Sequence, residues 1–444
     1  MKRRMLLYTV ILGGQMVAQT KPKVNSDSLL KFQTNILVTQ MYDSLDKEVG
    51  KVNKQDNAIL TGHAFNLLAA KNLASYLSSS ADFSLTKAYA LLDNTDGKVH
   101  VEGNLPVRRK NSKRLLGVVT LGAKSNIVEK VVKLYNNEKP ANDISGEVKV
   151  TWLIANNIKY YNGSQWSKLK ALAGGDQKEK MSIVRRRILQ EQKAKIQKEL
   201  AELIKSLDGM GTNDSIQILE DKIKSLSEDL ADNYYKEEQV AFSKSPEKYS
   251  NSQKMAWLSV LASIPVTETK YSIAESYVAK AHDVNYYPFS GSGRLSLMFD
   301  RYKVLKSFWN VSYIVGKSNT LLDSSIDQSV ITKTVRIDTS SVINSTSKTY
   351  FSKSGFQQYV TETLRGQVVL FPVPSKNSYI GIDFFGDLNI KNGDATWGFG
   401  IPVSLKDKDE KPLVNFELIL NKINQPENRI LSLSLAVPFG SIIY

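Results

Sequence analysis

The sequence reads ATWGFGIPVSLK at residues 395–406, PLVNFELILN at 412–421 and ILSLSLAVPF at 430–439. In each stretch large apolar side chains alternate with small or polar ones, as in Leu431 and Ser432. A period of two residues is typical of a β-strand that has one apolar face. The segments between these stretches are short and polar, as hairpin turns are. This end of the chain therefore predicts consecutive antiparallel strands.

Similar alternation recurs through most of the chain. Segments of about nine to twelve residues lie near 82–92, 98–107, 114–124, 146–156, 255–266, 293–301, 304–315, 365–373, 378–388, 395–405, 413–422 and 430–440, with a weaker one near 327–338. They are longer than the five or six residues typical of soluble sheets and match a tilted crossing of a bilayer. The face opposite the apolar one is rich in Gly, Ser, Asn and Asp, which suits a lumen. We therefore expect an all-β fold, a transmembrane antiparallel β-barrel of 12–14 strands over residues 81–444.

The N-terminus and the composition indicate export. Lys2, Arg3 and Arg4 precede a short apolar core at 5–14, and Ala18 stands before a polar segment, which predicts a signal peptide at 1–19. The chain has no cysteine, which excludes disulfides, thiolate metal sites and a lipidated cysteine. Removing the three basic signal residues from the net charge of +15 leaves +12. This surplus favours anionic lipid and lipopolysaccharide phosphates, and export disfavours nucleic acid.

Residues 365–444, with their short turns and a last strand that runs toward Tyr444, resemble the C-terminal half of Gram-negative outer-membrane β-barrel proteins. The lysine- and asparagine-rich composition is similar to that of the Bacteroidetes branch, although no specific family is identified. The resemblance implies a place in the cell outer membrane and assembly by the barrel-assembly machinery. The residues that match its signal are Leu435, Val437, Phe439 and Tyr444, while Pro438 is expected to interrupt the strand.

Residues 178–242 break the strand pattern. Two helical stripes of apolar residues flank a glycine-containing loop, which predicts an antiparallel α-helical coiled-coil hairpin inserted in the barrel. The stripes are Leu189, Ile196, Leu200, Leu203 and Leu207, then Ile216, Leu219, Ile223, Leu226 and Leu230. A long insertion of this kind usually has a function, and contact with an envelope partner protein is the leading hypothesis. Arg185, Arg186 and Arg187 are candidates for that contact, a solvated helix face being the plainer alternative.

Catalytic and metal motifs are not found. The three histidines, His63, His100 and His282, are not paired at a metal-ligand spacing, and no G-x-S-x-G motif is present. Asp383 and Asp387 share a strand face about 13 Å apart, which is too far for joint acid–base chemistry. We therefore expect no catalytic residue, no cofactor and no metal, and we interpret His100 and the two aspartates as residues that line a lumen.

The sequence leaves two functions open. The first is an outer-membrane barrel that anchors the helical hairpin for partner contact and could let solutes pass. The alternative is a soluble, exported β-sandwich adhesin or structural envelope protein with a coiled-coil arm, because a sandwich shows the same alternation. Residues 20–80 do not decide between them, since they fit either an N-terminal extension or a plug in the lumen.

Overall fold

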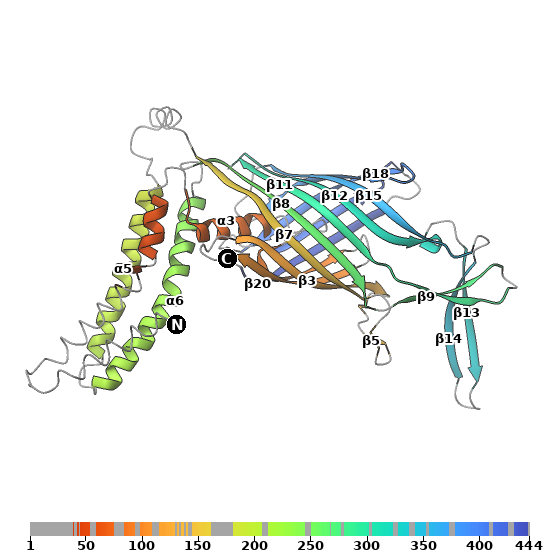
Figure 1. Cartoon of the computed structure of the whole chain (residues 1–444), viewed down its shortest axis with the longest axis horizontal. Helices are drawn as coiled ribbons and strands as arrows, with labels where there is room; N and C mark the ends of the chain where they lie inside the picture. Colours follow the sequence, from red (N-terminus) through yellow and green to blue (C-terminus); the bar gives the residue numbers. More distant parts are fainter. Residues whose placement is uncertain are drawn as a thin grey trace, which may run out of the picture. The chain divides into compact units, whose positions relative to one another are not determined.

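A computed structural model gives the fold of the chain (Figure 1). It describes residues 39–442 except 40–41, 44, 54–58, 75–83, 94–97, 109–114, 129–130, 133–134, 137–138, 141–143, 161–180, 207–211, 245–249, 267, 277–278, 302–303, 323–326, 337–341, 352–354, 373–377, 408–411 and 425–429. The expected signal peptide at 1–19 lies outside these residues. The chain forms two compact units, one of residues 1–61 and 179–241 and one of residues 62–178 and 242–444.

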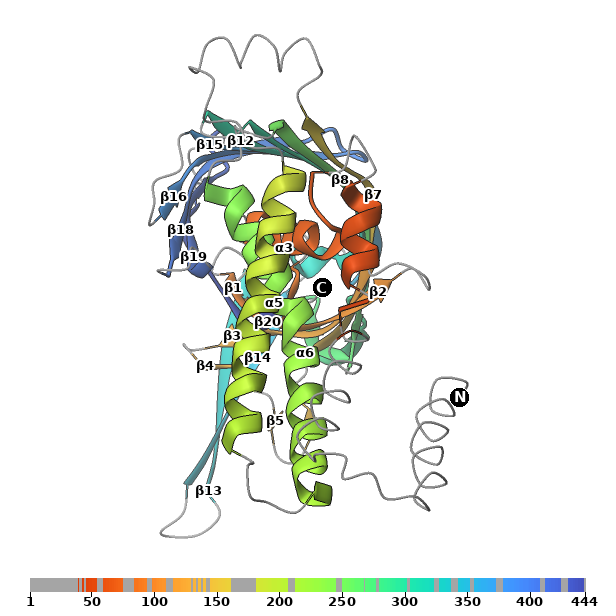
Figure 2. The ribbon, with the colours of Figure 1, turned by 90° about the vertical axis from the view of Figure 1, so that its left-hand side faces the viewer.

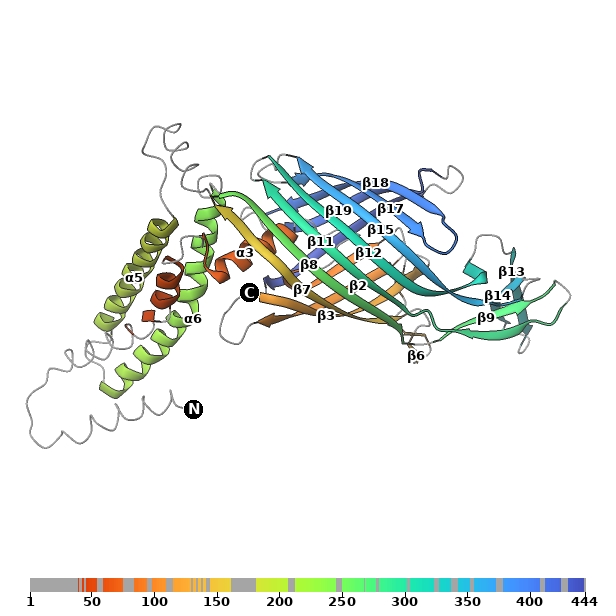
Figure 3. The same cartoon turned by 45° about the horizontal axis from the view of Figure 1, so that its top comes forward.

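The second unit contains a closed antiparallel barrel of twelve strands (Figures 1 and 3). Strands that follow one another in the chain lie side by side, and the last pairs with the first through Ala436 and Leu91, so the sheet closes. The strands are β1 (Thr86–Asp93), β2 (Lys98–Arg108), β3 (Leu115–Val128), β7 (Ser145–Tyr160), β8 (Ser250–Pro265), β11 (Ser290–Arg301), β12 (Leu305–Asn319), β15 (Gln358–Pro372), β17 (Ile382–Asn389), β18 (Ala395–Lys406), β19 (Pro412–Asn421) and β20 (Ile430–Ile442).

Each of the twelve stronger segments predicted from the sequence coincides with a barrel strand, so the barrel is confirmed. The sandwich alternative is wrong, because one sheet closes on itself instead of two sheets packing face to face. The segment predicted near 378–388 is divided by Gly381 into β16 (Ser378–Ile380) and β17. A Cβ at Gly381 would lie 2.7 Å from the carbonyl oxygen of Leu370, so this close approach of two strands requires glycine.

The alternating pattern sorts side chains between the two faces of the barrel wall. Small and polar residues point inward and are buried, as are some large apolar residues such as Trp257 and Phe308, while the large apolar residues of the other face point outward and are exposed. This outward set, here called the apolar belt, is made of Val101, Leu105, Leu121, Val148, Trp152, Ile154, Leu258, Val260, Ile264, Leu295, Leu297, Trp309, Val311, Tyr313, Leu364, Ile382, Phe384, Leu388, Trp397, Ile401, Leu405, Leu418, Leu431 and Leu433. It extends over every barrel strand from β2 to β20.

The segment predicted near 327–338 is a strand, β13 (Asp327–Arg336), but not a barrel strand. It pairs with β14 (Val342–Phe351) in a separate four-stranded sheet that also holds β9 (Thr269–Ala274) and β10 (His282–Tyr286). These strands are inserted after β8 and after β12, so they belong to one end of the barrel (Figure 1). Short pieces elsewhere are β4 (Val131–Val132), β5 (Tyr135–Asn136), β6 (Lys139–Pro140) and the 3-10 turn η2 (Thr320–Leu322).

Helix α3 (Gly62–Ala74) lies within the ring of strands (Figure 2). Its residues Ala69, Ala70 and Leu73 belong to one buried apolar cluster with inward-facing Trp257 and Phe308 of the barrel wall. Removing these side chains from water holds the helix in place. The helix falls in the range for which the sequence left an extension or a plug open. Among the described residues, no helix is both long enough and apolar enough to cross a lipid bilayer.

The first unit is helical. It contains α5 (Met181–Ser206) and most of α6 (Thr212–Lys244), together with helical residues at 45–53. Predicted stripe residues are buried in both long helices, namely Leu189, Ile196, Leu200, Leu219, Ile223 and Leu230. Gln192 donates a hydrogen bond to Glu237 at 2.5 Å, and Lys222 lies 3.6 Å from Glu199. The contacts thus pair early α5 with late α6, which is an antiparallel order.

Candidate functional site: the ion-paired lumen

Charged residues gather on the inner wall formed by β1, β2, β3 and β7. Lys149 donates to Glu102 at 2.8 Å and to the hydroxyl of Tyr89 at 3.1 Å, and Tyr89 in turn donates to Glu102. All three side chains are buried. A Cβ at Gly122 would lie 2.7 Å from Cγ of Glu102, so glycine at this register position leaves the space that the Glu102 side chain fills.

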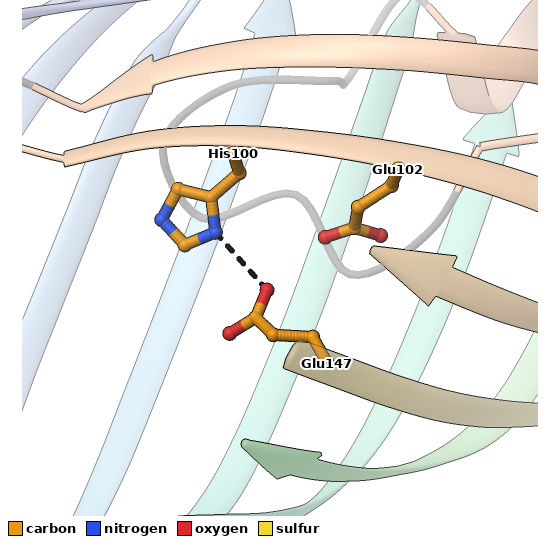
Figure 4. A group of neighbouring side chains, drawn as sticks. All are labelled: His100, Glu102 and Glu147. Carbon is orange, nitrogen blue, oxygen red and sulfur yellow. Dashed lines mark hydrogen bonds and ion pairs between the residues drawn. The ribbon is translucent and has the colours of Figure 1, made fainter. Parts of the chain in front are cut away.

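A second ion-paired group adjoins the first (Figure 4). Glu147 lies 2.9 Å from Nζ of Lys124 and 3.2 Å from Nδ1 of His100. Ligand atoms of His100, Glu102 and Glu147 lie within 4.8 Å of one another, a spacing that could hold a metal ion. Each carboxylate, however, already has its own lysine, Lys149 or Lys124. A cation would have to displace both, so these contacts favour a charge-balanced structural network over a metal centre.

Amide and carboxyl groups cover the opposite wall. Asn310 donates to Gln367 at 2.9 Å, and Gln367 donates to Asp383 at 2.7 Å. Asp387 instead accepts two hydrogen bonds from Arg365, at 2.6 and 2.7 Å. The two aspartates singled out in the sequence therefore have separate partners, and both line the lumen. On each of these two walls, therefore, polar groups bond to partners on nearby strands of the same wall.

Helix α3 is tied to the wall by polar bonds as well as by apolar contact. Asn72 donates to Gln253 of β8 at 2.8 Å and accepts from Lys306 of β12 at 2.8 Å. Lys306 also lies 3.7 Å from Asp300. Because Gln253 and Lys306 stand near the starts of their strands, α3 occupies the barrel end opposite to the four-stranded sheet. The arrangement fills this end of the lumen with protein.

The barrel-assembly signal can be followed only in part. Leu435 and Val437 lie in β20, where they pair with Leu92 and Ala90 of β1. Phe439 belongs to the same strand, and Tyr444 lies outside the described residues. The expectation that Pro438 interrupts the strand is wrong, since β20 continues through it to Ile442. A strand tolerates proline where its missing N–H is not needed for a hydrogen bond to the neighbouring strand. Pro438 pairs with Tyr89, and the register between β20 and β1 shifts just beyond it, between Ala88 and Thr86.

The three arginines of α5 occupy different environments. Arg186 and Arg187 are exposed, as a partner contact requires. Arg185 is buried, and it donates to Asn53 at 2.8 Å and to the carbonyl oxygen of Ile59. Arg185 is therefore not accessible to a partner, because it is buried against Asn53 and Ile59. Periodicity alone does not reveal this, since Asn53 and Ile59 lie more than a hundred residues earlier in the chain.

Glu238 is a buried carboxylate in this helical unit. Its carboxylate accepts from the backbone N–H of Thr61 at 3.0 Å and from its hydroxyl at 2.6 Å, and Arg185 lies 3.7 Å away. Burial raises the pKa of Glu238 to about 7, while Thr61 and Arg185 lower it and Glu48 raises it further. The folded unit therefore holds this proton more tightly than the unfolded chain does.

This difference between the folded and unfolded pKa of Glu238 predicts that the stability of the helical unit depends on pH. An unfolded Glu loses its proton near pH 4.5 and folded Glu238 near pH 7, so the stabilisation is complete below about 4.5 and is lost as the pH rises to about 7. We expect the free energy of unfolding of the helical unit to fall by about 3 kcal/mol between these two pH values. Thermal unfolding followed by helical circular dichroism at pH 5 and pH 8 measures it. Glu238→Gln should flatten the dependence, whereas exposed Glu191→Gln should not.

The sequence did not single out Lys149, Glu102 or Tyr89. The alternation identifies Glu102 and Lys149 as polar-face residues of two strands, and a signal was present: both are charged at positions that a closed barrel turns inward. What was missing is the strand register, since Lys149 and Glu102 are 47 residues apart. No protein-family model and no curated protein matches this sequence.

Proposed function

We propose that the chain is a Gram-negative outer-membrane β-barrel protein whose barrel anchors a helical arm for contact with an envelope partner. The observation that carries the proposal is the apolar belt, which covers the outside of a closed barrel whose inside is polar and ion-paired. A water-soluble protein rarely exposes more than a few hundred Å² of contiguous apolar surface. A lipid-embedded barrel needs such a surface, because its backbone groups are paired within the closed sheet and its side chains meet hydrocarbon.

Strand length supports the same proposal. A tilted strand needs about nine to eleven residues to cross a bilayer, and β7, β8, β12 and β15 have 16, 16, 15 and 15. The excess lies at the barrel ends, where β8 and β12 lead into the four-stranded sheet. The basic N-terminal segment agrees with export, and the net charge of +12 that remains without it agrees with a membrane that carries anionic phosphates.

The arm is the part of the proposal that concerns a partner. The chain leaves the barrel at the end of β7 and returns at the start of β8, which is the end that holds α3. The antiparallel contacts of α5 and α6 agree with the predicted coiled-coil hairpin. Its exposed residues include Arg186, Arg187 and the apolar Ile183 and Ile218. Exposed apolar and arginine side chains together are typical of protein-binding surfaces.

Solute passage is the less favoured function, because α3 occupies one end of the lumen and ion-paired side chains project into it. In a planar bilayer we expect no steady conductance from the full chain. Deletion of residues 62–74 should produce a steady current, and Asn72→Leu, which removes the bonds to Gln253 and Lys306, should produce intermittent openings. Steady conductance by the unaltered chain would contradict the sealed barrel. Heat-modifiable migration of each variant on a gel verifies that the barrel has folded.

A further inference from the structure

A hollow of about 430 Å³ interrupts the apolar belt on the outer wall of β11, β12, β15, β17 and β18. The outward side chains that line it among the described residues are apolar: Leu295, Leu297, Trp309, Val311, Val368, Phe384 and Trp397. Its volume is in the range of ligand-binding pockets. The hollow opens on the outer face, and it is also bordered by Asn310 and Gln367, whose side chains bond to each other in the lumen.

Strand register explains why the wall is hollow here. Val311 pairs with Gly366, Gly366 with Gly386, and Gly386 with Trp397, so two glycines stand side by side in one row. The neighbouring row carries Trp309 and Phe384, which project beside them. Gly366 and Gly386 have no side chains and so form the floor of the hollow, and the rings of Trp309 and Phe384 form its side.

The chemistry of the hollow selects hydrocarbon. Among the residues that the structure describes, no charged side chain lines it, and the indole N–H of Trp309 already donates to Ser307 at 3.2 Å. A sugar, a peptide or a phosphate would lose its hydrogen bonds to water without replacement. At about 4.8 Å between neighbouring strands, the row from Leu295 to Trp397 extends about 19 Å across five strands.

We propose that this hollow binds one acyl chain of a membrane phospholipid, held between Trp309, Phe384 and Trp397 over Gly366 and Gly386. The inference rests on the proposed membrane location, because the hollow is continuous with the belt that faces lipid. A second copy of this chain is the main rival, since small residues also let membrane proteins approach closely. The exposed rings of Trp309 and Trp397 oppose that approach, whereas a thin, flexible chain passes between them.

The glycines allow a direct test. A Cβ at Gly366 meets no atom within 4 Å, and one at Gly386 has only ordinary contacts at 3.6 Å, so Gly366→Leu and Gly386→Leu fill the hollow without backbone strain. Gly293 is the matched control, because it is exposed on β11 outside the hollow and a Cβ there also meets nothing within 4 Å. The full chain, refolded in detergent micelles, is mixed with dipalmitoyl phosphatidylethanolamine or dipalmitoyl phosphatidylglycerol, and native mass spectrometry counts the retained lipid.

We expect the unaltered chain and Gly293→Leu to retain one lipid, and the double variant to bind about tenfold more weakly or not at all. Both lipids should be retained equally, because only the chain is recognised. Equal retention by the double variant, a preference for one headgroup, or a dimer mass that the substitutions abolish would each overturn the proposal. Gly366→Leu alone serves if the double variant does not fold. Failure of the membrane proposal would give a different result, because the unaltered chain would then fold in buffer without lipid or detergent.

Discussion

Lys149→Met is expected to lower the free energy of unfolding of the barrel by about 3–5 kcal/mol, the cost typical of leaving one charge of a buried ion pair alone. The Lys149 ammonium is the cation that faces Glu102, and both side chains are less than a tenth exposed. Without it, Tyr89 remains as a donor to Glu102, but one hydroxyl replaces less of the lost water than an ammonium does. Urea titration in lipid vesicles measures the change.

A double-mutant cycle separates the lost charge from the lost packing. Lys149→Met combined with Glu102→Gln removes both charges and keeps side chains of similar size, so we expect most of the stability to return. Losses that merely add would mean that the two residues do not interact. Tyr89→Phe is the milder comparison, and it should cost about 1 kcal/mol because it removes only the hydroxyl hydrogen bonds.

Val260→Arg is the second substitution with a large expected effect. Val260 is 47% exposed in the middle of β8, so in water an arginine there would change the free energy of unfolding by no more than about 0.5 kcal/mol. In a bilayer the same arginine faces hydrocarbon, and we expect a loss of about 2–4 kcal/mol. The sign and size of this one change therefore report whether the apolar belt meets lipid or water.

The matched control places the same charge away from the belt. Ser276→Arg lies in an exposed segment after β9, and it should leave the stability in vesicles within about 0.5 kcal/mol of the unaltered chain. Refolding yield in lipid vesicles, read at increasing urea concentration, compares the two variants. If Val260→Arg is as stable as Ser276→Arg, the belt does not face hydrocarbon.

Strand positions could be predicted from the sequence because their cause is local. Ser432 and Leu433 face opposite sides whatever their neighbours are, so a period of two is visible in a single strand. Closure could be favoured from strand length and the polar inner face but not decided, because a sandwich shows the same alternation. The edge segment 327–336 shows the limit: its alternation indicates a strand but not the sheet to which it belongs, since that depends on pairing with 342–351.

The lumen network and the buried arginine could not be predicted, because they depend on contacts far apart in sequence. Lys149 meets Glu102 only through the registers of β2, β3 and β7, and a slip of one residue would turn either side chain outward. In the sequence Arg185 is one of three equivalent basic residues, and only its bonds to the distant Asn53 and Ile59 distinguish it. Such contacts follow from topology and not from a periodic pattern.

The most direct test of the account is whether folding of the barrel depends on lipid. The chain without residues 1–19 is unfolded in urea and diluted into buffer with or without phospholipid vesicles, and the folded fraction is measured on a gel without boiling. The apolar belt predicts a folded, heat-modifiable band with vesicles and aggregated or unfolded protein without them. An equal yield of soluble, folded protein without lipid would contradict the membrane barrel.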